Sequence, residues 1–245
     1  MRLDHLLVSL GTGSRRDVQK WIRAGCVQVN GQVQKDPGVH LSEQHEIVLD
    51  GQRLDTRLER HVMLNKPTGV LTAARDPKQK TVMDLLPGVY RALQCMPCGR
   101  LDKDTEGLLI FTTDGELSHR LLSPARHVDK CYEARVEGIL CEKDRDLFAS
   151  GMDLGDFTAA PAVLTILQTA SSESVAQVII HEGKFHQVRR MFEYTGHPVI
   201  ELRRLSFGPV ALDPELAPGA FRELTREEEN RLYAAAGLDH GTDVF

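Results

Sequence analysis

The chain has 245 residues, of which 41% are hydrophobic and 27% charged, and its formal net charge is -5 at pH 7. This composition is ordinary for a globular protein of one or two domains. No apolar run approaches the roughly 18 residues of a membrane span, and the N-terminus lacks the hydrophobic region of a signal peptide. Five cysteines with irregular spacing fit a reducing compartment better than a disulfide framework, so we expect a cytoplasmic protein.

The charge is unevenly distributed along the chain. Residues 1–35 hold six basic and two acidic side chains, a local net charge of +4. Polyanion binding depends on local potential rather than on the sum over the chain, so this segment is a candidate contact for nucleic acid. A solvated helix face with scattered arginines is the alternative interpretation.

The first part of the chain, to about residue 59, is predicted to hold two helices and a small sheet. Leucines recur at helical spacing over residues 3–10, and a second helix is expected over residues 14–24 after a capping-box-like start. Alternating residues on both sides of Asn30-Gly31 predict a β-hairpin, and residues 46–49 predict a further strand.

This arrangement, basic on its first helical face, resembles the S4 domain, an RNA-binding module. The resemblance is carried by residues 2–4 (Arg-Leu-Asp), 14–16 (Ser-Arg-Arg) and 25–31 (Gly-Cys-Val-Gln-Val-Asn-Gly). It implies contact with structured RNA, which is recognised by shape and by its phosphates. The expected RNA-binding residues here are Arg2, Arg15, Arg16 and Lys20. A small dimerisation domain is the alternative.

From about residue 60 the pattern predicts a second, larger domain. Strands are expected at residues 61–67, 107–113, 130–136, 161–168 and 175–181. Helices are expected at residues 82–86, 116–122, 142–150, 186–194 and 225–236. Strands with helices interspersed indicate an α+β fold, in which helices lie on a mixed sheet.

The most informative segment is residues 99–115, where two acids and two bases crowd a turn that leads into an apolar strand. Asp102 and Asp104 suggest a carboxylate pair, but the paired acids of glycosidases normally sit on separate elements. A single carboxylate close to Arg100 suggests instead an ionised nucleophile or base. A turn-capping role for Asp102 is the structural alternative.

Three further motifs are candidates for chemistry. In residues 183–192 a helix is predicted to begin near His186 with two arginines in its first turns. Cations there oppose the helix dipole and favour an anionic partner; an exposed basic face is the alternative. Tyr132 lies on an alternating strand, usually a half-core position, and offers a flat face for stacking a base. Cys95 and Cys98 have C-x-x-C spacing without a second pair of zinc ligands, so we expect neither a metal nor a redox role.

Together these motifs resemble the pseudouridine synthases, in the branch with an N-terminal S4 domain. The matching residues are Gly-Arg-Leu-Asp at 99–102 with Thr105 and Gly-Leu-Leu at 107–109, Lys-x-Tyr at 130–132, and Gly-Lys-x-His-Gln-Val-Arg-Arg-Met at 183–191. Within that branch, His186-Gln187 is most similar to the synthases of small-subunit (16S) ribosomal RNA. The large-subunit synthases tend to have Arg-Glu at this place.

The resemblance implies a mechanism. A uridine leaves the RNA stack, and Tyr132 is the expected stacking partner of the extruded base. Asp102 attacks or deprotonates the ribose, which releases uracil from C1′, and the base rejoins through C5. Arg189 is the expected salt-bridge partner of Asp102. Further RNA contacts are expected from Arg100, Arg190 and Lys184. Such an isomerisation needs no metal, nucleotide or redox cofactor.

We therefore predict a site-specific 16S ribosomal RNA pseudouridine synthase of the uridine-516 class. Residues 1–59 are the predicted S4-like domain and residues 60–245 the predicted catalytic domain. The expected partner is ribosomal RNA, alone or in an assembly particle, bound by a monomer without membrane or small-molecule cofactor. The alternatives are a large-subunit (23S) synthase, a non-catalytic RNA-binding or assembly factor, and a glycoside hydrolase that uses Asp102.

Overall fold

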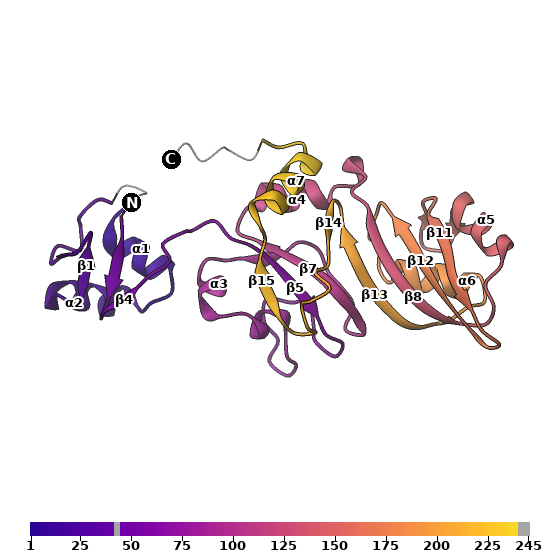
Figure 1. Ribbon diagram of the computed structural model, residues 1–245, viewed down its shortest axis with the longest axis horizontal. Coiled ribbons are helices and arrows are strands. Elements are labelled where there is room, and N and C mark those ends of the chain that lie inside the picture. The colour runs from indigo at the N-terminus through magenta and orange to yellow at the C-terminus, as the bar shows by residue number, and fades with distance from the viewer. Residues whose placement is uncertain (42–44, 240–245) are drawn as a thin grey trace. The chain divides into compact units, whose positions relative to one another are not determined.

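The computed structural model describes residues 1–41 and 45–239 (Figure 1). Residues 42–44 and 240–245, which fall within the two predicted domain ranges, lie outside the described residues. The chain forms two compact units, one made of Met1–Arg60 with Leu86–Cys95 and the other of the remainder. The division after residue 59 stays a prediction. Among the described residues, none of the helices has the length and apolarity that a membrane span requires.

The first unit packs helices against a small antiparallel sheet. Helix α2 begins after Ser14, whose hydroxyl accepts a hydrogen bond from the Asp17 amide, and it ends at Gly25 in the left-handed conformation. The helices of the first unit are α1 (Leu3–Ser9), α2 (Arg15–Ala24) and α3 (Gly88–Ala92). Its strands, in spatial order, are β2 (Gln32–Val33), β1 (Val27–Val29), β3 (Ile47–Leu49) and β4 (Gln52–Arg53). The core is built from apolar residues of α1, α2, β1 and β3.

The second unit is built on a nine-stranded sheet. Its main path, in spatial order, is β11 (Val163–Thr169), β12 (Glu173–Ile180), β8 (Lys130–Glu137), β13 (Val199–Phe207), β7 (Thr105–Thr112), β5 (His61–Lys66) and β15 (Phe221–Glu223). The short strands β14 (Val210–Ala211) and β6 (Met96–Pro97) pair with β13 and β7. Pairing is antiparallel throughout except between β13 and β7, so the predicted mixed sheet and α+β class are confirmed.

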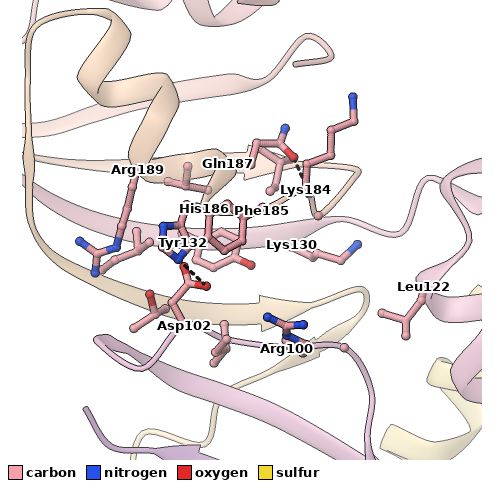
Figure 2. A pocket seen from close by; sticks show the side chains of 17 residues that line it. Arg100, Asp102, Leu122, Lys130, Tyr132, Lys184, Phe185, His186, Gln187 and Arg189 are labelled. Carbon is pink, nitrogen blue, oxygen red and sulfur yellow. Dashed lines mark hydrogen bonds and ion pairs between the residues drawn. The ribbon is translucent and has the colours of Figure 1, made fainter. Parts of the chain in front are cut away.

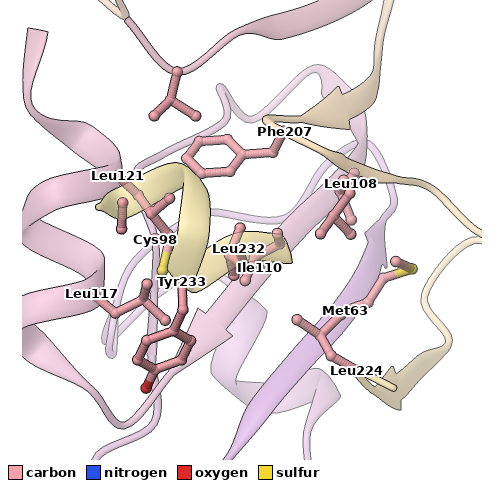
Figure 3. Close-up of a cluster of buried hydrophobic side chains, with 13 residues drawn as sticks. Met63, Cys98, Leu108, Ile110, Leu117, Leu121, Phe207, Leu224, Leu232 and Tyr233 are labelled. Carbon is pink, nitrogen blue, oxygen red and sulfur yellow. The ribbon is translucent and has the colours of Figure 1, made fainter. Parts of the chain in front are cut away.

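Helices cover this sheet and complete its core. They are α4 (Gly115–Leu122), α5 (Glu142–Ser150), α6 (Gln187–Tyr194) and α7 (Arg226–Ala236), with single 3-10 turns at Val82–Leu85 and Pro124–Arg126 and a separate ribbon of β9 (Met152–Asp153) and β10 (Thr158–Ala159). Figure 3 shows Leu117 of α4 and Leu232 of α7 converging on Ile110 of β7. Because Tyr233 donates a hydrogen bond of 2.8 Å to the N-cap residue Asp114, α7 also holds the start of α4.

Strand β13 lies in the middle of the sheet, yet the sequence pattern does not predict it. The strand carries charged residues among its apolar ones, including Arg203 and Arg204. Arg204 is nevertheless buried: its Nε donates to the carbonyl of Leu108 at 2.7 Å, and its guanidinium lies 5.2 Å from the centre of the Phe207 ring. A buried arginine with these partners is indistinguishable in sequence from a solvated one.

Candidate active site

The turn that carries Asp102 connects β6 to β7, and hydrogen bonds from Lys66 hold its backbone in place. Lys66, the last residue of β5, is fully buried. Its ammonium group donates to the backbone carbonyls of Asp102 at 2.9 Å and Thr105 at 2.8 Å, and it also reaches the carbonyls of Pro67 and Lys103. Burial lowers the pKa of Lys66 to about 8, against the opposing effect of nearby carboxylates. The sequence pattern does not predict a role for this lysine in the site.

A pocket of about 410 Å³ opens beside this turn. One wall is the segment of residues 99–102, another is Tyr132 of β8, and a third is the segment of residues 183–189 that enters α6 (Figure 2). Tyr132 is buried in the wall, whereas the side chain of Asp102 retains 27% of its exposure. The pocket therefore brings together five of the predicted site residues: Arg100, Asp102, Tyr132, Lys184 and Arg189.

His186 is the residue that contacts the carboxylate of Asp102. Its Nε2 lies 3.4 Å from Oδ1 of Asp102, and its ring stacks on Phe185 with 3.9 Å between centroids and 16° between planes (Figure 2). His186 occupies the N-cap position of α6 with φ of 50° and caps nothing with its side chain. Non-glycine residues in the left-handed region are uncommon and gather at functional sites. In the sequence, His186 marks the family motif and its branch, but the pattern does not predict its contact with Asp102.

The expected salt bridge between Arg189 and Asp102 is corrected by the structure. Nη2 of Arg189 lies 3.1 Å from Oδ2 of Asp104 and donates to the Asp104 carbonyl at 3.2 Å. The place beside Asp102 is taken by His186, three residues earlier in the same segment. Arg189 therefore ties α6 to the Asp102 turn through the neighbouring acid.

Two other predicted RNA-binding residues are engaged with the loop before β10. The guanidinium of Arg190 and the ammonium of Lys184 lie 4.6 Å and 4.7 Å from the centre of the Phe157 ring. Arg190 also forms an ion pair with Asp156 and lies outside the pocket lining. Lys184 donates to the Thr158 carbonyl at 2.8 Å. These contacts fix the loop against the start of α6.

The remaining predicted cations differ in how available they are. Arg100 is exposed at the pocket and, within the described part of the chain, makes no hydrogen bond or ion pair. In the first unit, Arg15, Arg16 and Lys20 are exposed on α2, whereas Arg2 pairs with the buried Asp4 at 2.9 Å. That pairing lowers the pKa of Asp4 to about 2.

The arrangement suits a particular kind of chemistry. A carboxylate in a partly enclosed pocket, contacted by an imidazole, is equipped to act as nucleophile or base. The aromatic wall accepts a flat ring, and the cations nearby favour a ligand that carries phosphate. No metal-binding cluster of His, Cys, Asp or Glu is found among the residues that the structure describes.

Comparison with known proteins gives two matches to protein families. Residues 60–194 match the family described as RNA pseudouridylate synthase, and residues 1–47 match the S4 domain. The chain is 38% identical over 247 residues to the ribosomal large subunit pseudouridine synthase B of Bacillus subtilis, covering 100% of this chain and 99% of that protein.

A second relative and a solved structure agree with these matches. The chain is 38% identical over 231 residues to the ribosomal small subunit pseudouridine synthase A of Pseudomonas aeruginosa, covering 93% of this chain and 98% of that protein. A crystal structure of a pseudouridylate synthase is similar with a TM-score of 0.66 and 32% identity, covering 95% of this chain and 99% of the other.

Proposed function

The chain belongs to the RNA pseudouridylate synthase family and is an isomerase, and from this premise we propose that it converts a uridine of ribosomal RNA into pseudouridine. The observation that carries the proposal is the pocket itself. It sets the carboxylate of Asp102 beside an imidazole and near the buried Tyr132, with cations around the opening. The family match supports this reaction over the glycosidase alternative.

In the proposed reaction the target uridine leaves the RNA stack and its uracil lies against Tyr132. Asp102 attacks C1′ of the ribose, or removes a ribose proton, and the bond between N1 and C1′ breaks with its electrons on the uracil. The freed base turns so that C5 faces C1′, and a carbon–carbon bond forms there. As it forms, the bond between Asp102 and C1′ breaks and the carboxylate is regenerated or, on the second route, Asp102 returns the proton to the ribose. The proton on C5 is then lost and N1 gains one, with Tyr132 placed to assist, so that no atoms are gained or lost overall.

The other charged residues are proposed to bind and orient the RNA. Arg100 has no protein partner in the described structure, which leaves its guanidinium available for a phosphate or for the gap left by the extruded base. Arg189 acts on the turn through Asp104 rather than on Asp102 directly. Lys184 and Arg190 must give up part of their contacts around Phe157 before they can reach RNA.

The first unit is proposed to supply additional RNA affinity. Its match to the S4 domain and the exposed Arg15, Arg16 and Lys20 support this role. Reversing the charge of Arg15 and Arg16 together should weaken binding to ribosomal RNA by roughly tenfold or more at low salt. Unchanged affinity would remove the first unit from the proposal.

We keep residues 1–59 and 60–245 as the proposed domains, and we propose a monomer acting in the cytoplasm.

We further propose the small subunit as the target, within the uridine-516 class. Relatives of both subunit types are equally identical to this chain, so the support comes from His186-Gln187 in the pocket segment. The test is to map pseudouridines in both ribosomal RNAs from cells with and without the protein. Loss at one 16S position is expected. Loss in 23S RNA would reassign the subunit, and no loss in either RNA would contradict a ribosomal substrate.

A further inference from the structure

Phe185 has the most exposed of the large apolar side chains among the described residues, with 67% of its surface accessible. Single exposed apolar residues are common on proteins and need no explanation by themselves. Phe185 differs from others such as Tyr194 and Val163 because it lines the pocket that contains Asp102 (Figure 2). An exposed ring at this place is available to a bound ligand.

The ring is also held in position before any ligand binds. One face of Phe185 stacks on His186 at 3.9 Å, and His186 in turn contacts Asp102. The preceding residue, Lys184, is fixed by the Thr158 carbonyl and the Phe157 ring. A ring that is already ordered loses little conformational freedom when a ligand stacks on it, which favours binding.

The surroundings of the ring indicate what kind of ligand it takes. Arg100, Lys184 and Arg189 line the same pocket. Aromatic rings among cations are the usual means of binding unpaired nucleotides, because every base has a flat face and every phosphate a negative charge. The buried Tyr132 is already assigned to the target uracil, so Phe185 is left for another base.

We propose that Phe185 is a stacking platform for the nucleobase adjacent to the target uridine in the RNA strand. When the uridine leaves the stack, the neighbouring base loses a stacking partner, and the outer surface of Phe185 replaces it. The resulting order would be neighbouring base, Phe185, His186, with His186 next to Asp102. This inference rests on the proposed function, because it takes RNA as the ligand.

The test uses the full chain and a ribosomal RNA hairpin that contains the mapped uridine. The hairpin is prepared with its normal bases, with an abasic site on the 5′ side of the uridine, and with an abasic site on the 3′ side. Wild type and Phe185→Ala are compared on all three RNAs by kcat/KM for pseudouridine formation. Phe185→Ala should lower kcat/KM by about tenfold or more on the normal RNA, the usual effect of losing one stacked base.

The decisive quantity is the coupling between the two changes. At one of the two flanks, the abasic site should lower the kcat/KM of wild type by about the same factor as Phe185→Ala does on normal RNA. The same abasic site should not lower the kcat/KM of Phe185→Ala any further. Phe185→Trp should keep this coupling, whereas Phe185→Leu, which keeps apolar volume without a flat ring, should lose it. Tyr194→Ala is the matched control, because Tyr194 is an exposed aromatic residue outside the pocket lining. This variant should have the same kcat/KM as wild type on each of the three RNAs.

Two outcomes would overturn the inference: no loss of kcat/KM with Phe185→Ala, or losses that multiply independently at both flanks. Phe185→Leu gives a second variant should the alanine variant fail to fold. Absence of pseudouridine formation by the wild-type protein would instead contradict the proposed function, so the two failures are distinguishable. Stacking can also be measured without turnover. RNA that carries 2-aminopurine at the coupled flank is bound to the Asp102→Asn protein, and the fluorescence of the 2-aminopurine reports whether that base is stacked.

Discussion

Nε2 of His186 lies 3.4 Å from Oδ1 of Asp102, and His186 adopts a left-handed backbone conformation at the entrance to α6 while making this contact. The Phe185 ring stacks on the same imidazole. The carboxylate proposed to carry the reaction is therefore oriented by a residue of the segment that also lines the pocket. Arg189, three residues later, secures the same turn through Asp104.

Replacing His186 by alanine removes this orienting contact. We expect kcat to fall by about two- to fivefold, the usual effect of losing one partly exposed polar contact, with a smaller change in KM. His186→Asn, which keeps a donor, should recover part of the loss. His127→Ala is the matched control, because His127 is also left-handed and exposed but does not line the pocket. An unchanged kcat for His186→Ala would show that the contact does not orient Asp102.

Replacing Lys66 by methionine leaves the carbonyls of the Asp102 turn without their shared donor. Each buried polar group left unsatisfied costs about 1–3 kcal/mol, so the second unit should lose at least that much in its free energy of unfolding. Activity should fall as well, because the turn is no longer anchored. Urea denaturation and kcat measure the two effects. Lys78→Met, at an exposed lysine of the same unit, should change neither; equal stability of the two variants would contradict the anchoring role.

Gly107 of β7 lies opposite Arg204 of β13 in the parallel pairing of these strands. Its φ is +100°, and a Cβ atom there would lie 2.3 Å from the carbonyl oxygen and 2.7 Å from the amide nitrogen of Arg204. Both neighbours are backbone atoms that cannot move without separating the strands. Gly107→Ala should therefore destabilise the protein by roughly 3 kcal/mol or more. Gly115→Ala, where the added methyl group meets open space, should be close to neutral, and thermal unfolding compares the two.

The carboxylate of Glu228, in the first turn of α7, should make the free energy of unfolding depend on pH under acidic conditions. Arg222 and the Thr225 amide bind the carboxylate of Glu228, and these contacts lower the pKa of Glu228 from 4.5 to about 2. The lowered pKa means that the stabilisation, about 1–3 kcal/mol, is fully present above pH 4.5 and is lost as the pH falls toward 2. Glu228→Gln should be less stable at pH 7 and should flatten the pH dependence within that window.

Urea titrations at several pH values test this expectation. Glu227→Gln serves as the control, because Glu227 is exposed in the same first turn of α7. A Glu228→Gln curve that runs parallel to that of wild type between pH 4.5 and 2 would contradict the assignment.

The sequence could predict which segments meet but not how their side chains pair. The resemblance to a known family brought the motifs around Asp102, Tyr132 and His186 together, whereas local pattern alone left a turn cap, a half-core position and an exposed helix face as alternatives. One pocket contains all three residues. Whether Arg189 reaches Asp102 or Asp104 depends on the direction of side chains two residues apart in a turn, which no sequence period specifies. The predicted salt bridge of Arg189 with Asp102 was therefore wrong, and Arg189 pairs with Asp104 instead.

Two buried cations set a second limit on prediction. Lys66 and Arg204 look in sequence like solvated charges at a strand end and on a loop. Both are buried because backbone carbonyls from other strands accept their hydrogen bonds. Such partners are distant in sequence, so neither the anchoring of the Asp102 turn nor the central position of β13 could be predicted from local pattern.

We propose that the carboxylate of Asp102 drives the isomerisation of uridine in ribosomal RNA, and release of tritium tests this role most directly. Ribosomal RNA made with uridine tritiated at C5 is incubated with wild type and with Asp102→Asn, and binding of each protein to the same RNA is measured in parallel. Wild type should release tritium, whereas Asp102→Asn should release none and bind the RNA nearly as well, because the amide keeps the shape and loses the charge. Release by Asp102→Asn, or none by wild type, would contradict the claim.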